Sequence, residues 1–464
     1  MTRVRPARRQ DEAGIALIAV MVLLMILSVA ISAMSVSGRT EITISRRHES
    51  AALAETAGEA GLNHAIELTL ANLNRWEFNG LATTSAAVSN LLLGPDGASG
   101  TADADADNGS LEAFGVPRQP ARLPLAGTTP TQYDARVFDE DDPLRGVPLD
   151  ANDIASIGED AIPTIDNNAT IVIQANGYGP DGAITTLEAV ASPFTLPAIV
   201  SNGDLEIQGN VSIEGTNGSV HANNELELNG STTISVDATA TYGYSESGNP
   251  TVGGQTGAGR PQIPIPPISA LDYKPQADYI LQNDGVMVDQ GGATICDASA
   301  DGNACEDAGY LWKFDGSDGW QLNTNDQAVA GNHHTYYVEG DATISGSPGS
   351  NADPLDISII AEGSISVTGS PVIEANTPAL LFVTDLDLKI AGDLQQVGAE
   401  ARILVHEQLK VTGNASLAGE ILIEDASGLG SMVIENSFGG NITITNNETM
   451  AARVFGVRGW REVG

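Results

Sequence analysis

Hydrophobic and polar positions divide the chain into one long apolar segment near the start and many short alternating segments later. Residues 14–36 contain no charged side chain, and the segment before them carries Arg3, Arg5, Arg8 and Arg9. At ~1.5 Å rise per residue, a helix over this run is long enough to cross the ~30 Å hydrocarbon core of a bilayer. The basic flank favours a cytoplasmic N-terminus. The pattern therefore predicts one membrane-spanning helix followed by a large exported body.

Three interpretations of this apolar run stay open from its length and flanks. The first is a secretory signal peptide with cleavage near residues 31–33, although such a peptide needs an apolar region of only ~7–15 residues. The second is a plain single-span anchor. The third is that residues 1–14 resemble the basic leader of a type IV prepilin. In that case a peptidase cuts after Gly14 and leaves the apolar helix, which starts at Ile15, on the mature protein.

A helical pattern continues beyond the apolar run and favours the third interpretation. An apolar stripe recurs at helical spacing at Leu62, Ile66, Leu70 and Leu73. Alanines together with Gly58 and Gly61 make a slim face on which another helix can pack closely. Because a signal peptide has no need of this second half, we predict one helix over residues 15–75.

The leader and the helical continuation together resemble a known family. Gly14 and Ile15 after the basic leader, with the segment AALAETAGEAGL at residues 51–62, resemble the N-terminal domain of the PilX family of pilus-assembly proteins. These are minor pilin-like proteins of type IV pilus systems. The resemblance covers residues 1–75, and it implies cleavage between Gly14 and Ile15 and association with other pilin-like subunits through the helix.

One residue departs from the pilin pattern. Ala19 stands at mature position five, where major pilins carry a glutamate that pairs with the N-terminal amine of a neighbouring subunit. The departure favours a tip, priming or accessory position over routine polymerisation. The large pseudopilin at the tip of type II secretion pseudopili shows the same departure, so that relative stays open.

Short alternating segments and turn residues follow the predicted helix. Residues 131–139 alternate as one strand. Residues 170–175 and 183–190 predict a hairpin, because the connection at 176–182 is rich in turn-forming residues. A small antiparallel sheet packed on the end of the helix resembles a pilin headgroup. We therefore assign a pilin-like β region to residues 76–198.

A repeat begins at about residue 199, in which a short period-two strand ends in a glycine. These glycines are Gly209, Gly230, Gly346, Gly369, Gly392 and Gly413. A fixed period of roughly 20 residues is typical of a solenoid, in which each repeat makes one coil. An ordinary β-sandwich, the alternative, gives no reason for a fixed glycine spacing. We therefore predict a parallel β-solenoid over residues 199–440, interrupted by an insertion at 232–337 where the period is lost.

The predicted insertion is the place where we expect ligand contacts, because rigid coils support variable loops. It holds a proline-rich stretch at residues 260–267 and most of the aromatic side chains that we expect to be exposed: Tyr242, Tyr244, Tyr310, Trp312 and Trp320. Such a surface suits a glycan or a protein ligand. A lateral cap that only covers the solenoid is the alternative. Residues 441–464 are left as a C-terminal tail, either free or docked as a strand.

Composition narrows the partners and the chemistry. The chain carries 60 acidic against 21 basic residues, a net charge of −39, which repels nucleic acid. Its 51 glycines and few aromatic residues favour a β-rich, turn-rich body. No nucleophile elbow, phosphate-binding loop or zinc-protease motif occurs in the sequence. We therefore expect no enzymatic activity and no required cofactor.

The two cysteines and the loop between them are the remaining candidates for local chemistry. Cys296 and Cys305 lie far beyond the predicted anchor, where an oxidising compartment favours a disulfide. The residues between them place oxygen atoms at alternate positions, as in the first half of a calcium loop: Asp297, Ser299, Asp301 and Asn303. The glutamate expected at position 12 is absent. Calcium is the one metal that the sequence indicates, and a solvated polar loop that binds no metal is the alternative.

These observations predict a mainly β protein with one long N-terminal transmembrane helix, a pilin-like head and an interrupted parallel β-solenoid. The predicted function is that of a minor pilin-like protein of a type IV pilus assembly or a related secretion system. It would be anchored in the inner membrane, with its body in the periplasm or at the cell surface for assembly or adhesion contacts. The alternative is an anchored surface solenoid that binds or acts on carbohydrate and has no part in a pilus.

Overall fold

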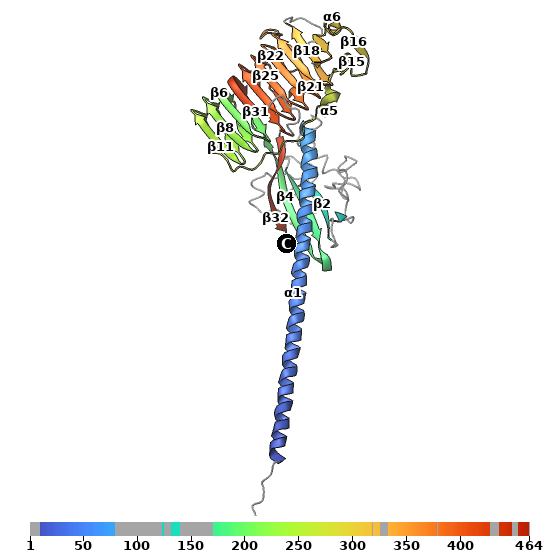
Figure 1. Cartoon of the computed structure of the whole chain (residues 1–464), viewed down its shortest axis with the longest axis vertical. Helices are drawn as coiled ribbons and strands as arrows, with labels where there is room; N and C mark the ends of the chain where they lie inside the picture. Colours follow the sequence, from blue (N-terminus) through green and yellow to red (C-terminus); the bar gives the residue numbers. More distant parts are fainter. Residues whose placement is uncertain are drawn as a thin grey trace, which may run out of the picture.

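One long helix projects from a β-rich body, as Figure 1 shows. The body has two parts: a five-stranded antiparallel sheet, which we call the head, and a large, mostly parallel β-solenoid. The predicted fold class is therefore confirmed. The computed structural model describes residues 10–78, 123–124, 131–139, 170–317, 319–324, 333–377, 379–426, 436–447 and 453–463.

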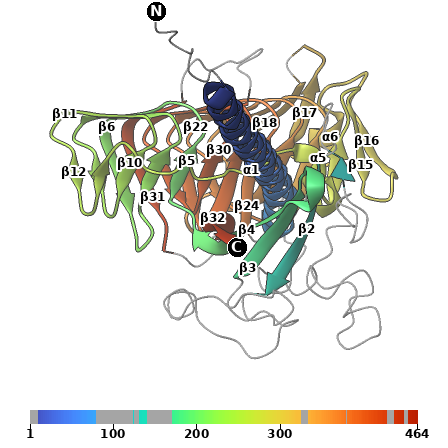
Figure 2. The ribbon, with the colours of Figure 1, turned by 90° about the horizontal axis from the view of Figure 1, so that it is seen from below.

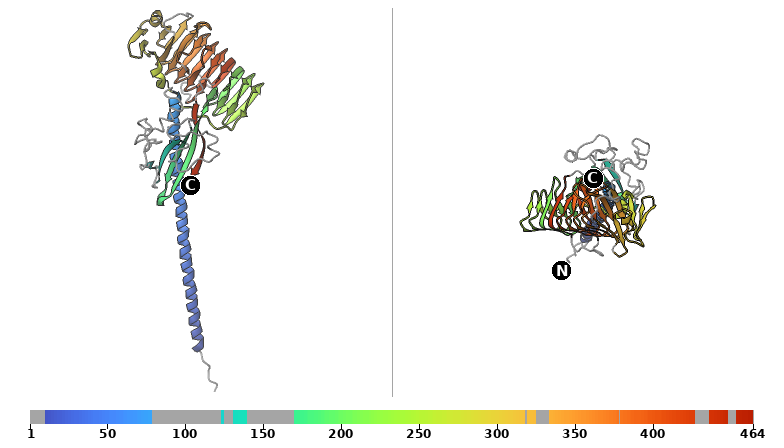
Figure 3. Two further views of the ribbon diagram at one scale, coloured as in Figure 1. Left: turned by 180° about the vertical axis from the view of Figure 1, so that it is seen from behind. Right: turned by 90° about the horizontal axis from the view of Figure 1, so that it is seen from above.

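Helix α1 (Gln10–Phe78) has 69 residues without a break, about 100 Å at 1.5 Å per residue. No proline occurs within it, so no backbone hydrogen bond is lost along its length. The apolar side chains described between Val20 and Ile44 are exposed, whereas the C-terminal half packs on the head. Figure 3 shows the solenoid at the end of the head opposite the exposed part of the helix.

The head is built from strands that alternate between buried and outward side chains. In spatial order its strands are β1 (Leu123–Pro124), β2 (Gln132–Asp139), β3 (Ile171–Tyr178), β4 (Ile184–Thr195) and β32 (Arg453–Val463), each antiparallel to the next. Inward residues of β3, such as Ile171 and Ile173, form a core with Leu62, Ala65 and Leu73 of α1. The predicted strand at 131–139 and the predicted hairpin are both present.

The C-terminal residues correct one domain assignment. The solenoid extends to the end of β31 (Asn436–Thr445), beyond the predicted limit of 440, and of the two alternatives for the residues after it the docked strand is found, because β32 completes the head. The partner of β32 is β4, so the two strands lie far apart in the sequence. A pairing between strands so far apart in the sequence has no local pattern, so the sequence alone does not decide between a free tail and a docked strand.

Each solenoid coil contributes strands to three faces, and neighbouring coils pair in parallel. Face 1 consists of β18 (Gly319–Thr324), β20 (Ala342–Gly346), β22 (Ile365–Gly369), β25 (Leu388–Gly392), β28 (Leu409–Gly413), the first half of β31, the first half of β6 (Leu205–Glu214), β8 (Glu225–Gly230) and β11 (Gly243–Gly248). Face 2 consists of β23 (Val372–Glu374), β26 (Gln395–Val397), β29 (Ser416–Ala418), the second halves of β31 and β6, β9 (Thr233–Ile234) and β12 (Thr251–Val252).

Face 3 lies toward the head. It consists of β14 (Tyr279–Leu281), β19 (His334–Val338), β21 (Leu355–Ala361), β24 (Ala379–Thr384), β27 (Ala401–Val405), β30 (Ile421–Ile423), β5 (Ile199–Ser201), β7 (Val220–Ala222), β10 (Ala238–Ala240) and β13 (Thr256–Gly257). Figure 2 shows the stack of coils from below, with α1 and the head in front of it. Alternate residues such as Ile390 and Val411 point inward and stack into one continuous core.

A column of glycines turns the chain from face 1 to face 2. Gly369, Gly392, Gly413, Gly440, Gly209, Gly230 and Gly248 stand in register on successive coils. Most have positive φ, for example +88° at Gly369, which glycine adopts without steric cost. A Cβ atom at Gly369 would lie 2.1 Å from the carbonyl oxygen of Gly346 on the preceding coil. These two requirements explain the repeat that the sequence shows.

The order of the coils in space differs from their order in the sequence. Residues 199–257 coil away from the middle of the stack, and the chain then returns along face 3 to the far end. From there residues 279–445 coil back until β30 and β31 pair with β5 and β6. The chain therefore enters the solenoid from β4 and leaves it toward β32 at adjacent strands in the middle of the stack.

The predicted insertion at 232–337 needs a correction at both boundaries, because β18 and β19, which begin before residue 338, already belong to the parallel coils. Residues 232–257 continue the solenoid, since β10 pairs in register with β7 and β11 with β8. The period shortens to 18 residues here, as between His221 and Thr239, which hid the repeat. The true interruption has two pieces. One is a strap, residues 260–277, which covers face 3 and includes α5 (Ala270–Tyr273) and η4 (Lys274–Gln276).

The second piece is a cap on the far end of the stack. It consists of β15 (Val286–Asp289), β16 (Thr294–Asp297), α6 (Ala304–Asp307) and β17 (Trp312–Asp315). Its strands pair antiparallel, β14 with β15, β15 with β16 and β17 with β18, and so end the parallel ladder at that side.

Candidate functional site

The exposed half of α1 is the largest uncovered apolar surface in the described part of the chain. Met25 and Met34 are 72% and 74% exposed, and the valines, leucines and isoleucines around them are similarly uncovered. Among the described residues, α1 alone is long and apolar enough to cross a membrane. Exposure of these apolar side chains to water is unfavourable, whereas the hydrocarbon core of a membrane accommodates them without that cost.

The predicted cleavage residues lie inside this helix. Gly14 and Ile15 both fall within α1, which begins at Gln10 in the described residues. The leader that precedes them, residues 1–9, lies outside the described residues. The structure therefore places the two residues on the same helix as the apolar surface, and cleavage between them stays a prediction.

The slim face of α1 contacts the chain's own head, which corrects the expectation that another helix packs there. A Cβ atom at Gly177 of β3 would lie 2.0 Å from the carbonyl oxygen of Ala54 and 2.2 Å from the amide nitrogen of Gly58. One at Gly61 would lie 2.6 Å from the ring of Tyr133. Small residues on both elements thus let helix and sheet approach closely, and this face of α1 is already covered by the chain's own head.

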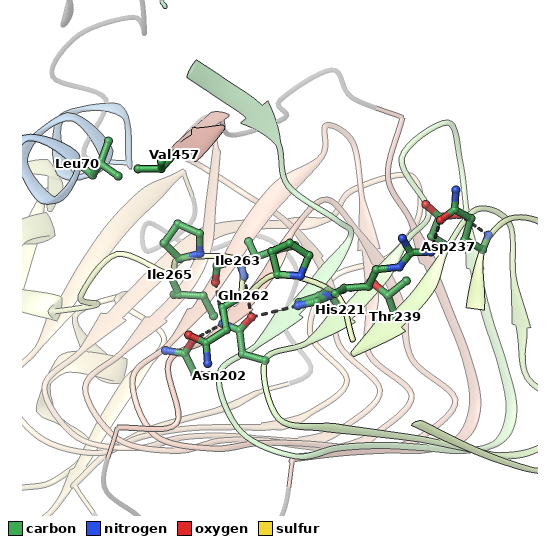
Figure 4. Close-up of a pocket in the computed structure, with 14 residues that line it drawn as sticks. Leu70, Asn202, His221, Asp237, Thr239, Gln262, Ile263, Ile265 and Val457 are labelled. Atoms are coloured by element: carbon green, nitrogen blue, oxygen red, sulfur yellow. Dashed lines mark hydrogen bonds between the residues drawn. The ribbon is translucent and has the colours of Figure 1, made fainter. Parts of the chain in front are cut away.

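A groove of about 880 Å³ separates the head from face 3 of the solenoid (Figure 4). Leu70 of α1 and Val457 of β32 form its apolar wall, and the strap forms the opposite side. His221 and Thr239 line its floor on neighbouring strands of face 3. No sequence pattern predicts this groove, because its walls come from three segments that are distant in the chain.

The polar side chains of the groove are occupied with one another. His221 Nδ1 lies 2.9 Å from Thr239 Oγ1 and its Nε2 lies 3.1 Å from Asn223 Oδ1. Asn223 donates to Asn202 Oδ1 at 2.6 Å and to the Ile263 carbonyl at 2.7 Å, and it accepts from the Ile263 amide at 2.8 Å. Burial lowers the pKa of His221, against the opposing effect of its Asn223 hydrogen bond. With both ring nitrogens engaged, this network fastens the strap to the solenoid.

The cysteine loop forms part of the cap. Cys296 and Cys305 are joined by a disulfide, with their Cα atoms 5.3 Å apart. It ties β16 to α6, so the loop between them is held at both ends.

The predicted calcium ligands make local turns within that loop. Asp297 Oδ1 accepts from the amide of Ser299 at 3.0 Å and from its hydroxyl at 2.5 Å, and these bonds lower the pKa of Asp297. Asp301 Oδ1 accepts from the amide of Asn303 at 3.2 Å. Within the described residues, no three His, Cys, Asp or Glu side chains gather as a metal site. The calcium assignment therefore stays a prediction without added support.

Two of the aromatic residues expected at the surface are core residues instead. Trp312 and Trp320 are fully buried, and Trp320 Nε1 donates to the carbonyl of Gln282 at 2.8 Å. They fill the end of the solenoid beneath the cap, where a large apolar side chain replaces the next coil. Tyr242 is 70% exposed as expected, and Tyr244 is half-buried against the other end of the core.

Sequence reasoning missed the ion pair that secures β32. Arg461 Nη2 lies 3.2 Å from Glu188 Oε2, and the Glu188 side chain is only 1% exposed. Gln174 Nε2 donates to the other carboxylate oxygen of Glu188 at 2.9 Å. Glu188 alternates with the core residues Leu187 and Ala189, so the strand pattern assigns it to the outward face and does not show that its carboxylate is buried.

Comparison with protein-family models gave no match, and comparison with curated proteins found no relative. Among solved structures, the chain is similar to the crystal structure of the competence-associated pilin ComZ from Thermus thermophilus. The identity is 11% and the TM-score 0.34, and the similarity covers 89% of this chain and 97% of that chain. We base the functional conclusions on this chain's own residues and geometry.

Proposed function

We propose that this chain is a pilin-like subunit of a type IV pilus assembly or a related secretion system, processed between Gly14 and Ile15. The helix is anchored in the inner membrane before assembly and packs among the helices of other subunits afterwards. The N-terminus is cytoplasmic in the precursor, and the head and solenoid are displayed on the far side of the membrane. The solenoid then serves assembly or adhesion contacts.

The observation that carries this proposal is the division of α1 into two halves. The C-terminal half is covered by its own antiparallel sheet, through the close contact at Gly177 and the core at Leu62, Ala65 and Leu73. The N-terminal half continues the same helix with its apolar side chains uncovered. Such a helix can move from lipid into a bundle of similar helices without a change in its own backbone, because both environments accept apolar side chains.

The covered half limits where a neighbouring subunit can pack. One face of α1 at residues 54–61 lies against β3 and β2, so the uncovered apolar side chains that a neighbouring subunit can cover lie on the segment from Val20 to about Ile44. Ala19 at mature position five lacks the carboxylate of major pilins. A small number of subunits at a tip or a priming complex needs fewer such pairings than a long filament does, which supports an accessory position.

The test is the mature N-terminus, measured by mass spectrometry on protein from membranes with and without an active prepilin peptidase. We expect a protein that starts at Ile15 only when the peptidase is present, and Gly14→Val should leave the precursor uncut in both samples. A start near Met34 would mean ordinary secretion and would exclude helix-bundle assembly. An intact Met1 in both samples would leave a plain anchor, and the carbohydrate-binding alternative would then take precedence.

A further inference from the structure

Face 1 of the solenoid carries an ordered column of charges at its centre. On five successive coils the outward residues in register are Lys389, Lys410, Ser437, Glu206 and Glu227. Two adjacent positive positions are thus followed by one small neutral residue and two adjacent negative positions. The same five coils place uncharged polar side chains in register on face 2: Gln395, Ser416, Thr443, Ser212 and Thr233. The charge order is therefore particular to face 1, and we call these five residues the charged column.

The lysines of the charged column are not neutralised within the described part of the chain. The sequence has four lysines, and the other two form ion pairs: Lys274 with Glu339 at 3.0 Å and Lys313 with Glu306 at 2.9 Å. Lys389 and Lys410 stand side by side on paired strands, an arrangement in which like charges repel. In a chain with a net charge of −39, this pair forms a local positive patch that attracts an anionic surface.

The glutamates of the charged column are similarly without a cation in the described residues. Glu206 and Glu227 share one amide, since Asn229 Nδ2 donates to them at 3.1 Å and 3.0 Å. No basic side chain pairs with either of them there. The two like-charged pairs therefore sit on the same face, about 10 Å apart from one inner residue to the other at the usual strand spacing.

The centre of the charged column carries only small residues. Ser437, which is 5% exposed and stands in register between the longer Lys410 and Glu206, and, two residues on, Gly439 occupy it on β31. Gly439 does not have positive φ, and a Cβ atom there would lie 3.4 Å from its nearest neighbour, an ordinary contact. The fold therefore does not require glycine at 439. A missing side chain at that point allows another surface to come close, while the longer charged side chains stand on both sides.

We propose that two copies of this chain pair through face 1, with the charged columns antiparallel. A two-fold axis parallel to the strands, at the level of β31, places Lys410 of one copy opposite Glu206 of the other and Lys389 opposite Glu227. Both like-charge repulsions within each copy are then compensated. The other in-plane axis, along the stack of coils, would place lysine opposite lysine, so the charge order selects one geometry. This inference does not depend on cleavage at Gly14 or on helix bundling.

The experiment is analytical ultracentrifugation of the full-length protein in detergent, with charge-swapped variants. We expect the unaltered chain to dimerise, and the variants Lys389→Glu/Lys410→Glu and Glu206→Lys/Glu227→Lys each to lose dimer affinity by about 100-fold. An equimolar mixture of the two double variants, each with a different tag, should form mixed dimers. The variant with all four changes should dimerise like the unaltered chain, because it restores the complementary order.

A matched pair of substitutions by a bulky side chain tests the contact at the centre of the charged column. Gly439→Arg on face 1 should prevent dimerisation, whereas Ser416→Arg on face 2 should leave it unchanged. Circular dichroism is the control for folding. We expect each variant to keep its β structure, since all the substituted residues lie on the outward side of their strands. A chain that is monomeric at about 100 μM would overturn the proposal, and so would double variants that still dimerise alone or fail to pair when mixed.

Discussion

The head and the solenoid both rely on glycine, but for different reasons. In the head, Gly177 and Gly179 are needed at one place, where the end of β3 approaches α1 at backbone contact distance. In the solenoid, Gly369 and its equivalents are needed on seven successive coils, because a Cβ atom there would meet the backbone of the neighbouring coil. A requirement that repeats leaves a period in the sequence, whereas a requirement at a single contact leaves no period among the 51 glycines.

The largest expected effect is in the head, at Gly177. Gly177→Val would place a Cβ atom 2.0 Å from the carbonyl oxygen of Ala54, against backbone that cannot move aside. We expect a loss of about 3 kcal/mol or more in the stability of the head. Hydrogen–deuterium exchange should show faster exchange in α1, β3 and β4 and little change in the solenoid. Gly316→Val, where a Cβ atom would meet nothing within 4 Å, is the control.

The corresponding change in the solenoid is Gly369→Ala. Its positive φ and the 2.1 Å approach to the Gly346 oxygen together should cost about 3 kcal/mol, since neither is relieved by a rotamer change. Exchange should accelerate in β20, β22 and β25, with the head unaffected. Gly439→Ala, on the same face but with ordinary φ and free space, should be nearly neutral. Equal effects of the two substitutions would contradict the role we assign to the glycine column.

A smaller effect in the head tests the place of β32. Arg461→Met removes the guanidinium group beside the buried Glu188 carboxylate, which should cost about 2 kcal/mol. Adding Glu188→Gln should recover part of the loss, because the amide carries no charge that a cation has to compensate. Glu462→Gln, on the same strand and exposed, is the control. If thermal unfolding is unchanged in Arg461→Met, β32 contributes little to the head.

The smallest effect concerns pH and His221. Burial lowers the pKa of folded His221 below the usual value of about 6.5, so the unfolded chain binds the proton more strongly. The contribution of the neutral His221 imidazole to the stability of the folded chain is therefore complete above about pH 6.5, and it is lost as the pH falls below that value. Between pH 7 and pH 5 the unaltered chain should lose about 1 kcal/mol relative to His221→Gln.

That comparison has to be made between the two proteins at each pH. Asp385 and Asp425 have pKa values raised by burial, so their contributions are lost as the pH rises and act in the opposite direction. Denaturant unfolding of both proteins at matched pH values gives the difference in their free energies of unfolding, and this difference reports the contribution of the His221 imidazole alone. A constant difference between the two proteins from pH 7 to pH 5 would show that His221 does not titrate differently in the fold.

Much of the architecture could be predicted from local pattern. The long helix followed from an uncharged run, the hairpin at β3 and β4 from turn residues between alternating strands, and the solenoid from glycine spacing. The coils at 232–257 escaped because their turns are shorter, which moved Gly248 out of the expected period. The strand β32 escaped because its partner β4 is distant in the sequence, and pairing at that distance has no local signature.

The candidate sites were less predictable for a similar reason. Cys296 and Cys305 are near neighbours in sequence and lie beyond the predicted anchor, and their pairing could be expected from these two facts together. The groove and the charged column are made by residues that only the coiling of the chain brings together, such as Lys410 and Glu206. The prediction that Trp312 and Trp320 are exposed was wrong, because the cap buries both side chains. The cap has no repeating pattern from which its presence could be predicted.

The position at which the chain enters and leaves the solenoid has a consequence for biosynthesis. When residues 199–257 emerge from the ribosome, they can form their own coils, but the edge of β5 and β6 stays open until residues 421–445 have been made. An open edge of parallel strands is a template for pairing with another chain. The middle coil is thus the last contact to close, and nascent chains are most prone to mispairing over the interval in which the strap, the cap and five further coils are translated.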